Sequence, residues 1–84
     1  MNERTLKALV EAGAVRQITI VADGSLFRVE AQTGGGPVIA STQRGAVKTW
    51  KSLDAAARWV RSLGIGSARI ELGGWQPGQR RLAG

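Results

Sequence analysis

The side chains in this 84-residue chain that could perform acid–base chemistry are six carboxylates, and the chain has no His, Cys or Tyr to work beside them. Those three absent residue types supply most proton shuttles, thiolate nucleophiles and transition-metal ligands. The carboxylates are Glu3, Glu11, Asp23, Glu30, Asp54 and Glu71. No two of them have a spacing that defines an acid–base pair. We therefore expect a protein that is not an enzyme, with no catalytic residue, no metal site and no cofactor.

Basic side chains dominate the remaining chemistry, with twelve Lys and Arg against six Asp and Glu and a net charge of +6. A basic surface binds a polyanion by releasing its counterions, so DNA is a candidate partner. The alternative is that the charges point in several directions and only keep the domain soluble. The candidate nucleic-acid-binding residues are Arg28, Arg44, Lys48, Lys51, Arg58, Arg61, Arg69, Arg80 and Arg81.

Three Trp residues accompany a single Phe, which is an unusual allocation of aromatic side chains. Trp50 is expected to pack under a helix, whereas Trp59 lies at the margin of a helical apolar stripe and Trp75 follows two glycines. An exposed Trp beside Arg is typical of a protein-interface hot spot or of a base-stacking platform. Trp59 and Trp75 are therefore candidate partner-binding residues, with core packing as the alternative for both.

The first half of the chain predicts a helix followed by a three-stranded meander. Residues 2–12 repeat apolar side chains at helical spacing after a capping Asn2, and Gly13 ends that helix. From residue 15 the period becomes two, and the dipeptide at 23–24 predicts a type I′ hairpin turn into a strand over residues 26–32. Three glycines and a proline then lead into a third strand over residues 38–42.

The second half predicts a short extended segment, a helix and a last strand. Residues 46–51 deliver Trp50 towards the core, Ser52 caps a helix that Gly64 ends, and residues 68–72 alternate as a strand. The order α-β-β-β-α-β indicates the α+β class, with a mostly antiparallel sheet of about four strands and both helices on one face. The other face is then open for a partner.

This organisation predicts one small domain over residues 1–75 and a flexible basic tail over residues 76–84. The chain begins with a charged amphipathic segment and contains no apolar run of the length that a bilayer requires. We therefore expect a cytoplasmic protein that does not bind membranes.

Two stretches carry a resemblance to a known family: residues 2–15, NERTLKALVEAGAV, and residues 45–65, GAVKTWKSLDAAARWVRSLGI. Together they resemble the small ParC-type partition-associated proteins of bacterial plasmids and integrative conjugative elements. The resemblance implies a role beside a ParA-type ATPase and a ParB-type centromere binder in maintaining a mobile element. It carries over no individual site residue, since neither stretch contains a catalytic signature.

The leading hypothesis is thus a non-enzymatic accessory protein of plasmid or mobile-element partition that binds DNA or a partition partner. The alternative is a protein–protein interaction module, either a homodimer or an adaptor for a ParA-type or ParB-type protein, without direct DNA binding. A nuclease inhibitor or host-defence antagonist also fits the size of the chain, but a basic protein is a less typical DNA mimic. None of these readings requires a small-molecule substrate.

Overall fold

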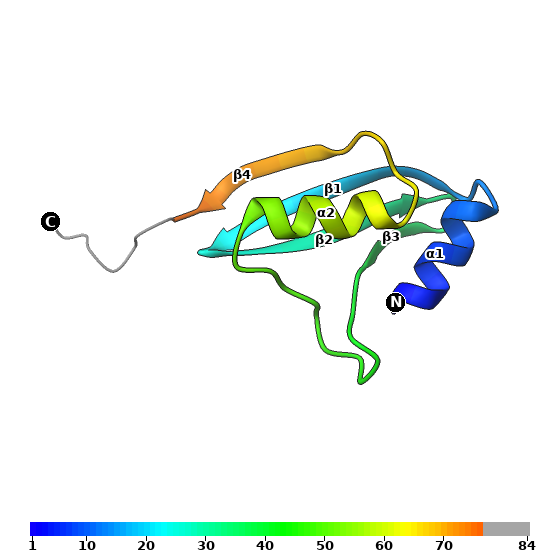
Figure 1. Ribbon diagram of the computed structural model, residues 1–84, viewed down its shortest axis with the longest axis horizontal. Helices are drawn as coiled ribbons and strands as arrows, with labels where there is room; N and C mark the ends of the chain where they lie inside the picture. Colours follow the sequence, from blue (N-terminus) through cyan, green and yellow to red (C-terminus); the bar gives the residue numbers. More distant parts are fainter. Residues whose placement is uncertain (77–84) are drawn as a thin grey trace, which may run out of the picture.

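Two helices and four strands follow one another in the predicted order in the computed structural model, which describes residues 1–76 (Figure 1). The elements are α1 (Glu3–Glu11), β1 (Val15–Gly24), β2 (Leu26–Thr33), β3 (Gly36–Ile39), α2 (Leu53–Ser62) and β4 (Arg69–Trp75). The α+β prediction is confirmed. Gln76, the first residue of the predicted tail, still donates its backbone N–H to the carbonyl of Gly24 at 2.8 Å, and residues 77–84 lie outside the described part.

The sheet has the strand order β3-β2-β1-β4 and is mixed. The β1–β2 and β2–β3 pairs are antiparallel, as the meander predicted, whereas β4 joins the other side of β1 in parallel. The parallel pair arises because α2 crosses the sheet face between β3 and β4, and such a crossover returns the chain in the same direction. β3 and β4 are consequently the two edges of the sheet.

The hairpin turn between β1 and β2 lies one residue later than the sequence predicted. Asp23 pairs with Leu26, so the two central residues are Gly24 and Ser25. Gly24 has a φ of 65°, and Ser25 is not among the residues of positive φ. A turn with positive φ only at its first central position matches type II′, and the predicted type I′ turn at 23–24 is wrong.

Both helices begin and end at the predicted signals. The Asn2 side chain accepts a hydrogen bond from the backbone N–H of Thr5 at 3.0 Å, and Ser52 Oγ accepts one from Ala55 at 3.1 Å. Gly13 and Gly64 follow the two helices with φ values of 74° and 95°, a conformation that favours glycine. These caps fix where the helices can lie against the sheet.

The third strand starts and ends earlier than predicted, at Gly36–Ile39 instead of residues 38–42. Thr33 Oγ1 donates to the carbonyl of Gly36 at 2.7 Å and closes the turn at once, so pairing resumes there. The predicted extended segment at 46–51 consists of isolated bridges. In one of them, Phe27 and Trp50 exchange two backbone hydrogen bonds of 2.9 Å, which brings Trp50 against the core.

A single core lies between the helices and one face of the sheet. It combines the helix residues Leu6, Ala56, Val60 and Leu63 with the strand residues Ile18, Ile20, Ala22, Phe27, Val29 and Ala31, and with Ala40. These residues of the first two strands alternate with the period of two that the sequence predicted, and they form the face of the sheet that points into the core. Figure 1 shows α2 lying across β1 and β2, with β4 to one side of the helix. Side chains of α2 and β4 line hollows between the two elements, so the helix side of β4 is only partly covered.

Candidate protein-interaction surface

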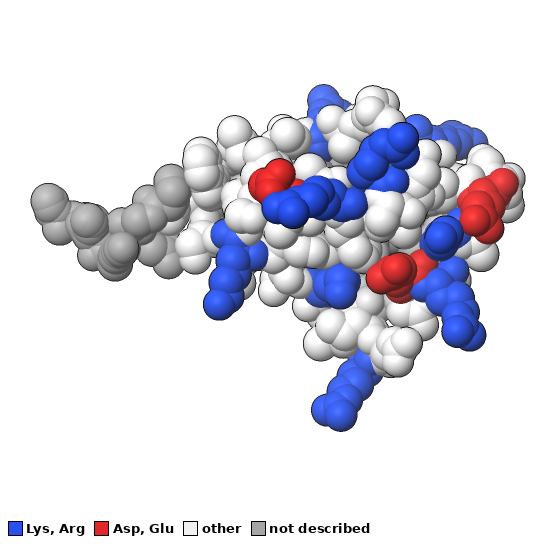
Figure 2. All heavy atoms as spheres, viewed as in Figure 1, with Lys and Arg blue, Asp and Glu red and all other residues white. Residues whose placement is uncertain are grey.

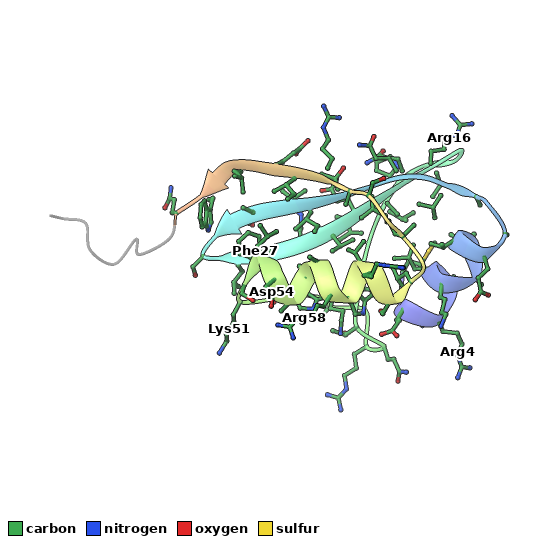
Figure 3. All side chains as sticks on the ribbon, turned by 45° about the horizontal axis from the view of Figure 1, so that its top comes forward. Arg4, Arg16, Phe27, Lys51, Asp54 and Arg58 are labelled. Atoms are coloured by element: carbon green, nitrogen blue, oxygen red, sulfur yellow. The ribbon has the colours of Figure 1, made fainter. Side chains whose placement is uncertain are left out.

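Two of the predicted nucleic-acid-binding residues already have carboxylate partners. The Arg28 guanidinium on β2 lies 3.5 Å from a carboxylate oxygen of Asp23 and 3.2 Å from one of Glu30. On α2, Arg58 pairs with Asp54 one turn earlier, and both side chains lie on the solvent side of the helix (Figure 3). An ion-paired cation is a weaker phosphate ligand because binding must first break the existing pair.

The other predicted basic residues are distributed over separate elements. Lys48 lies above the Trp50 ring, with its Nζ 5.6 Å from the ring centroid, and Arg44 is exposed in the loop after β3. Lys51 is exposed in that same loop, whereas Arg61 is exposed on α2 and Arg69 on β4. Figure 2 shows Lys and Arg spread along the whole visible face with acidic residues among them. Arg80 and Arg81 lie outside the described residues.

Sequence reasoning missed Arg16, which lines a shallow hollow together with Arg69, Gln17, Ser67 and Ala68. The two Arg residues are 53 positions apart, and only the parallel pairing of β4 with β1 brings their segments together. Figure 3 places Arg4 and Arg16 at the α1 end of the molecule and Lys51 at the opposite end. The basic residues therefore do not define one nucleic-acid-binding patch.

Trp59 is half-buried, and both its ring and its N–H group already have partners within the chain. Its ring centroid lies 4.9 Å from that of Trp50, and its Nε1 donates a hydrogen bond to Glu3 Oε1 at 3.1 Å. This bond joins α2 to the first turn of α1. The geometry gives Trp59 a packing role, and its partner-binding role stays a prediction that the contacts do not favour.

Trp75 presents a different environment at the end of β4. Its ring centroid lies 6.2 Å from that of Phe27, yet 43% of the residue is exposed. Together with Phe27, Leu53 and Leu72 it lines an apolar hollow beside α2. Trp75 is thus anchored on one side and available on the other, which suits a partner-binding residue.

All seven residues of β4 are exposed, including two further large apolar side chains. Ile70 is 45% exposed and Leu72 47%, although Ile70 pairs with the buried Ile20 and shares its side of the sheet. A bulge opposite Ala22 accommodates Leu72 and Gly73, which keeps both Leu72 and Trp75 towards the helix side. We call Ile70, Leu72 and Trp75 the β4 apolar row.

The two sheet edges differ in how far the chain itself covers them. Along β3, Pro37 has no N–H to offer, and the Met1 ammonium group donates to the carbonyl of Ile39 at 3.0 Å while Ser41 donates to the carbonyl of Met1 at 2.7 Å. β4 has β1 as its one strand neighbour within residues 1–76. The outer edge of β4 therefore keeps backbone groups without a strand partner, as edge strands that bind other chains do.

A second, smaller apolar group lies on the sheet face that carries no helix. Leu26, Ile39 and Val47 are exposed there and line one hollow with Arg28 and Asp23. This is the face that the sequence analysis expected to be used. The ion-paired Arg28, Asp23 and Glu30 lie on this face, and Thr19, opposite Glu30 and Arg69 on the adjacent strands, is only 5% exposed.

Comparisons of this chain with protein-family models, with curated proteins and with solved structures found no match. Neither helix in the described range is long and apolar enough to cross a bilayer. No cluster of three or more Asp, Glu, His or Cys side chains suited to a metal ion occurs among residues 1–76.

Proposed function

We propose that this chain is a non-enzymatic accessory protein that acts by binding another protein along β4. The observation that carries the proposal is the β4 apolar row, whose three large side chains are 43–47% exposed on an edge strand with one open side. Exposed apolar groups of this kind mark interaction sites in soluble proteins. The resemblance to ParC-type proteins makes ParA-type and ParB-type partition proteins the first partners to examine.

Strand addition is the binding mode that this surface supports. An incoming strand would hydrogen-bond to the open backbone edge of β4, while its side chains cover the β4 apolar row. Burying the exposed half of each large apolar side chain contributes roughly 1 kcal/mol before the cost of association. Three such side chains and a backbone ladder are enough for a specific, moderately weak contact.

The Leu72→Lys substitution tests the proposal because it places a charge in the centre of the β4 apolar row without removing a buried group. We expect it to abolish any association that the 84-residue chain shows in light scattering, alone or mixed with a ParA-type or ParB-type protein. The matched control is Val47→Lys, at a residue 51% exposed in the other apolar group. Val47→Lys should associate like the wild-type chain, and equal behaviour of the two variants would contradict the proposal.

DNA contact is a second candidate function, supported by the distribution of ion pairs. Ten Lys and Arg lie within residues 1–76, and all of them except Arg28 and Arg58 are without a carboxylate within 4.0 Å. The three carboxylates used in those pairs are Asp23, Glu30 and Asp54. The described surface thus has a positive excess beyond its internal pairs, and such an excess favours contact with phosphates of any sequence.

Because the free cations lie on separate elements, we expect only about three of them to reach phosphates at once. Affinity for duplex DNA should then fall with a log–log salt slope near −2.7, which is roughly 40-fold between 50 and 200 mM salt. Fluorescence anisotropy with two duplexes of unrelated sequence measures this, and both should bind equally. Absence of binding at 50 mM salt would remove DNA as a partner and leave the protein-binding proposal intact.

A further inference from the structure

We infer that the partner of β4 is a second copy of this chain, paired antiparallel about a two-fold axis at Ile70. This inference rests on the proposed function, since it takes β4 as the binding edge. The resulting dimer is one continuous eight-stranded sheet with the two β4 strands at its centre. Both α2 helices then lie on the same side of that sheet.

The side chains of β4 select this register. In an antiparallel pair centred on Ile70, Arg69 lies directly opposite the partner's Glu71, and Glu71 lies opposite the partner's Arg69. Both residues are exposed in the single chain, and neither has an ion-pair partner among the described residues. Opposite charges placed directly across an antiparallel pair are stabilising. Two antiparallel copies of β4 are therefore complementary to each other in charge.

Neighbouring registers lack this complementarity. Centring the pair on Arg69 places two Arg side chains opposite each other, and centring it on Glu71 places two carboxylates opposite each other, which is destabilising. Centring it on Leu72 brings the bulge at Leu72–Gly73 into the middle of the ladder and interrupts regular pairing. The register at Ile70 uses the straight part of the strand.

The apolar side chains fit the same register. Ile70 lies opposite the partner's Ile70. Leu72, at the start of the bulge, lies beside the partner's Ala68, which directly precedes β4 and whose small side chain leaves room for it. Two-fold antiparallel pairing keeps the helix side of both copies together, so the two β4 apolar rows form one continuous surface. A parallel pair would place the helices on opposite sides and would leave each row against the polar side of the other copy.

The fold also limits assembly to two copies. Met1 and Pro37 obstruct the β3 edge, so each chain offers one open edge within the described residues, and pairing at that edge closes the assembly. A single strand pair is a small interface, for which we expect a dissociation constant on the order of 10 µM. Association should therefore be measured over a wide range of concentration.

Charge exchange at Arg69 and Glu71 is the principal experiment, read by sedimentation equilibrium of the full chain. Arg69→Glu and Glu71→Arg alone each place like charges opposite each other and should weaken dimerisation at least tenfold. The double variant Arg69→Glu/Glu71→Arg should dimerise like the wild type. An equimolar mixture of the two single variants should form a heterodimer, because each then supplies the charge that the other lacks.

A cross-linking experiment tests the two-fold position independently. The chain has no Cys, so Ile70→Cys introduces one thiol that lies opposite its own copy in the dimer. Mild oxidation should convert it to a disulfide-linked dimer, while Val47→Cys, exposed but remote from β4, should remain unlinked at the same concentration.

The outcomes separate the two proposals. A wild-type chain that stays monomeric at several hundred micromolar, but binds a partition protein in a manner that Leu72→Lys abolishes, overturns the self-pairing and leaves the proposed function in place. The self-pairing is also overturned if the charge variants dimerise as strongly as the wild type and Ile70→Cys forms no disulfide-linked dimer, because another surface then holds the copies together. Monomers that bind nothing overturn both proposals.

Discussion

Replacing Leu6 with Ala is expected to lower the free energy of unfolding by about 3 kcal/mol. Leu6 is the one fully buried residue of α1, with 1% of its surface exposed, and it belongs to the central core. The substitution removes three carbon atoms from a closely packed site that the caps at Asn2 and Gly13 prevent from collapsing freely. A domain of this size is expected to have only about 5–10 kcal/mol of stability, so the loss is a large fraction of the total.

Thermal and urea unfolding followed by circular dichroism measure this effect. A loss of 3 kcal/mol should lower the melting temperature by roughly 15 °C. Lys7→Ala is the matched control, because Lys7 is the next residue of the same helix and is exposed. It should change stability by less than about 0.5 kcal/mol. Equal effects of Leu6→Ala and Lys7→Ala would mean that α1 is not held to the core through Leu6.

The helices could be predicted from local signals because their ends are fixed by local hydrogen bonds. Asn2 and Ser52 bind backbone N–H groups three residues ahead, and Gly13 and Gly64 take a backbone conformation that other residues avoid. The inward faces of β1 and β2 were equally predictable, since alternation with period two allows only one apolar face. These parts of the fold depend on interactions within short stretches of sequence.

The type of hairpin turn was not predictable from the Asp-Gly pair alone. Displacing the turn by one residue changes which two residues are central. The pairing of Asp23 with Leu26 depends on the whole register between β1 and β2. That register is fixed by apolar side chains matched across the strands, among them Ile20 opposite Val29. Tertiary pairing therefore overrode a strong local signal.

The exposure of β4 could not be read from its sequence, because Ile70 and Leu72 alternate with charged residues as they would in a half-buried strand. Their exposure follows from where α2 lies, over β1 and β2, and from the parallel attachment of β4 to the far side of β1. Both are long-range features. The candidate site therefore lies at the β4 edge of the sheet, whereas the sequence predicted the helix-free face.

The arrangement of the basic residues in space likewise depends on long-range pairing and could not be predicted from the sequence. In the sequence, Glu30 and Glu71 are interleaved with Arg along the strands, a pattern that favours the alternative in which the charges do not converge. The structure shows why for Arg28, which is held by Asp23 on the neighbouring strand and by Glu30 on its own. The sequence could not show that Arg69 and Glu71 lie side by side on an open edge with no internal partner in the described chain.

Gly74→Ala is expected to detach the end of β4 from β1, because no side chain fits at Gly74 while the two strands stay paired. A Cβ built at Gly74 would lie 2.9 Å from the carbonyl oxygen of Ala22, which belongs to a buried strand and cannot move away cheaply. Overpacking of this kind costs about 1–3 kcal/mol. The strand can avoid that cost only by moving away from β1, which would lift Trp75 from Phe27.

Gly73→Ala is the matched control, since a Cβ at Gly73 has no atom within 4 Å. Hydrogen exchange of the β4 amides and near-ultraviolet circular dichroism of the Trp residues report on the two variants. Faster exchange and an altered Trp signal are expected for Gly74→Ala alone, together with weaker association, because Trp75 then leaves the β4 apolar row. If the two variants exchange and associate alike, β4 does not depend on this close approach, and the edge geometry on which both proposals rest would be wrong.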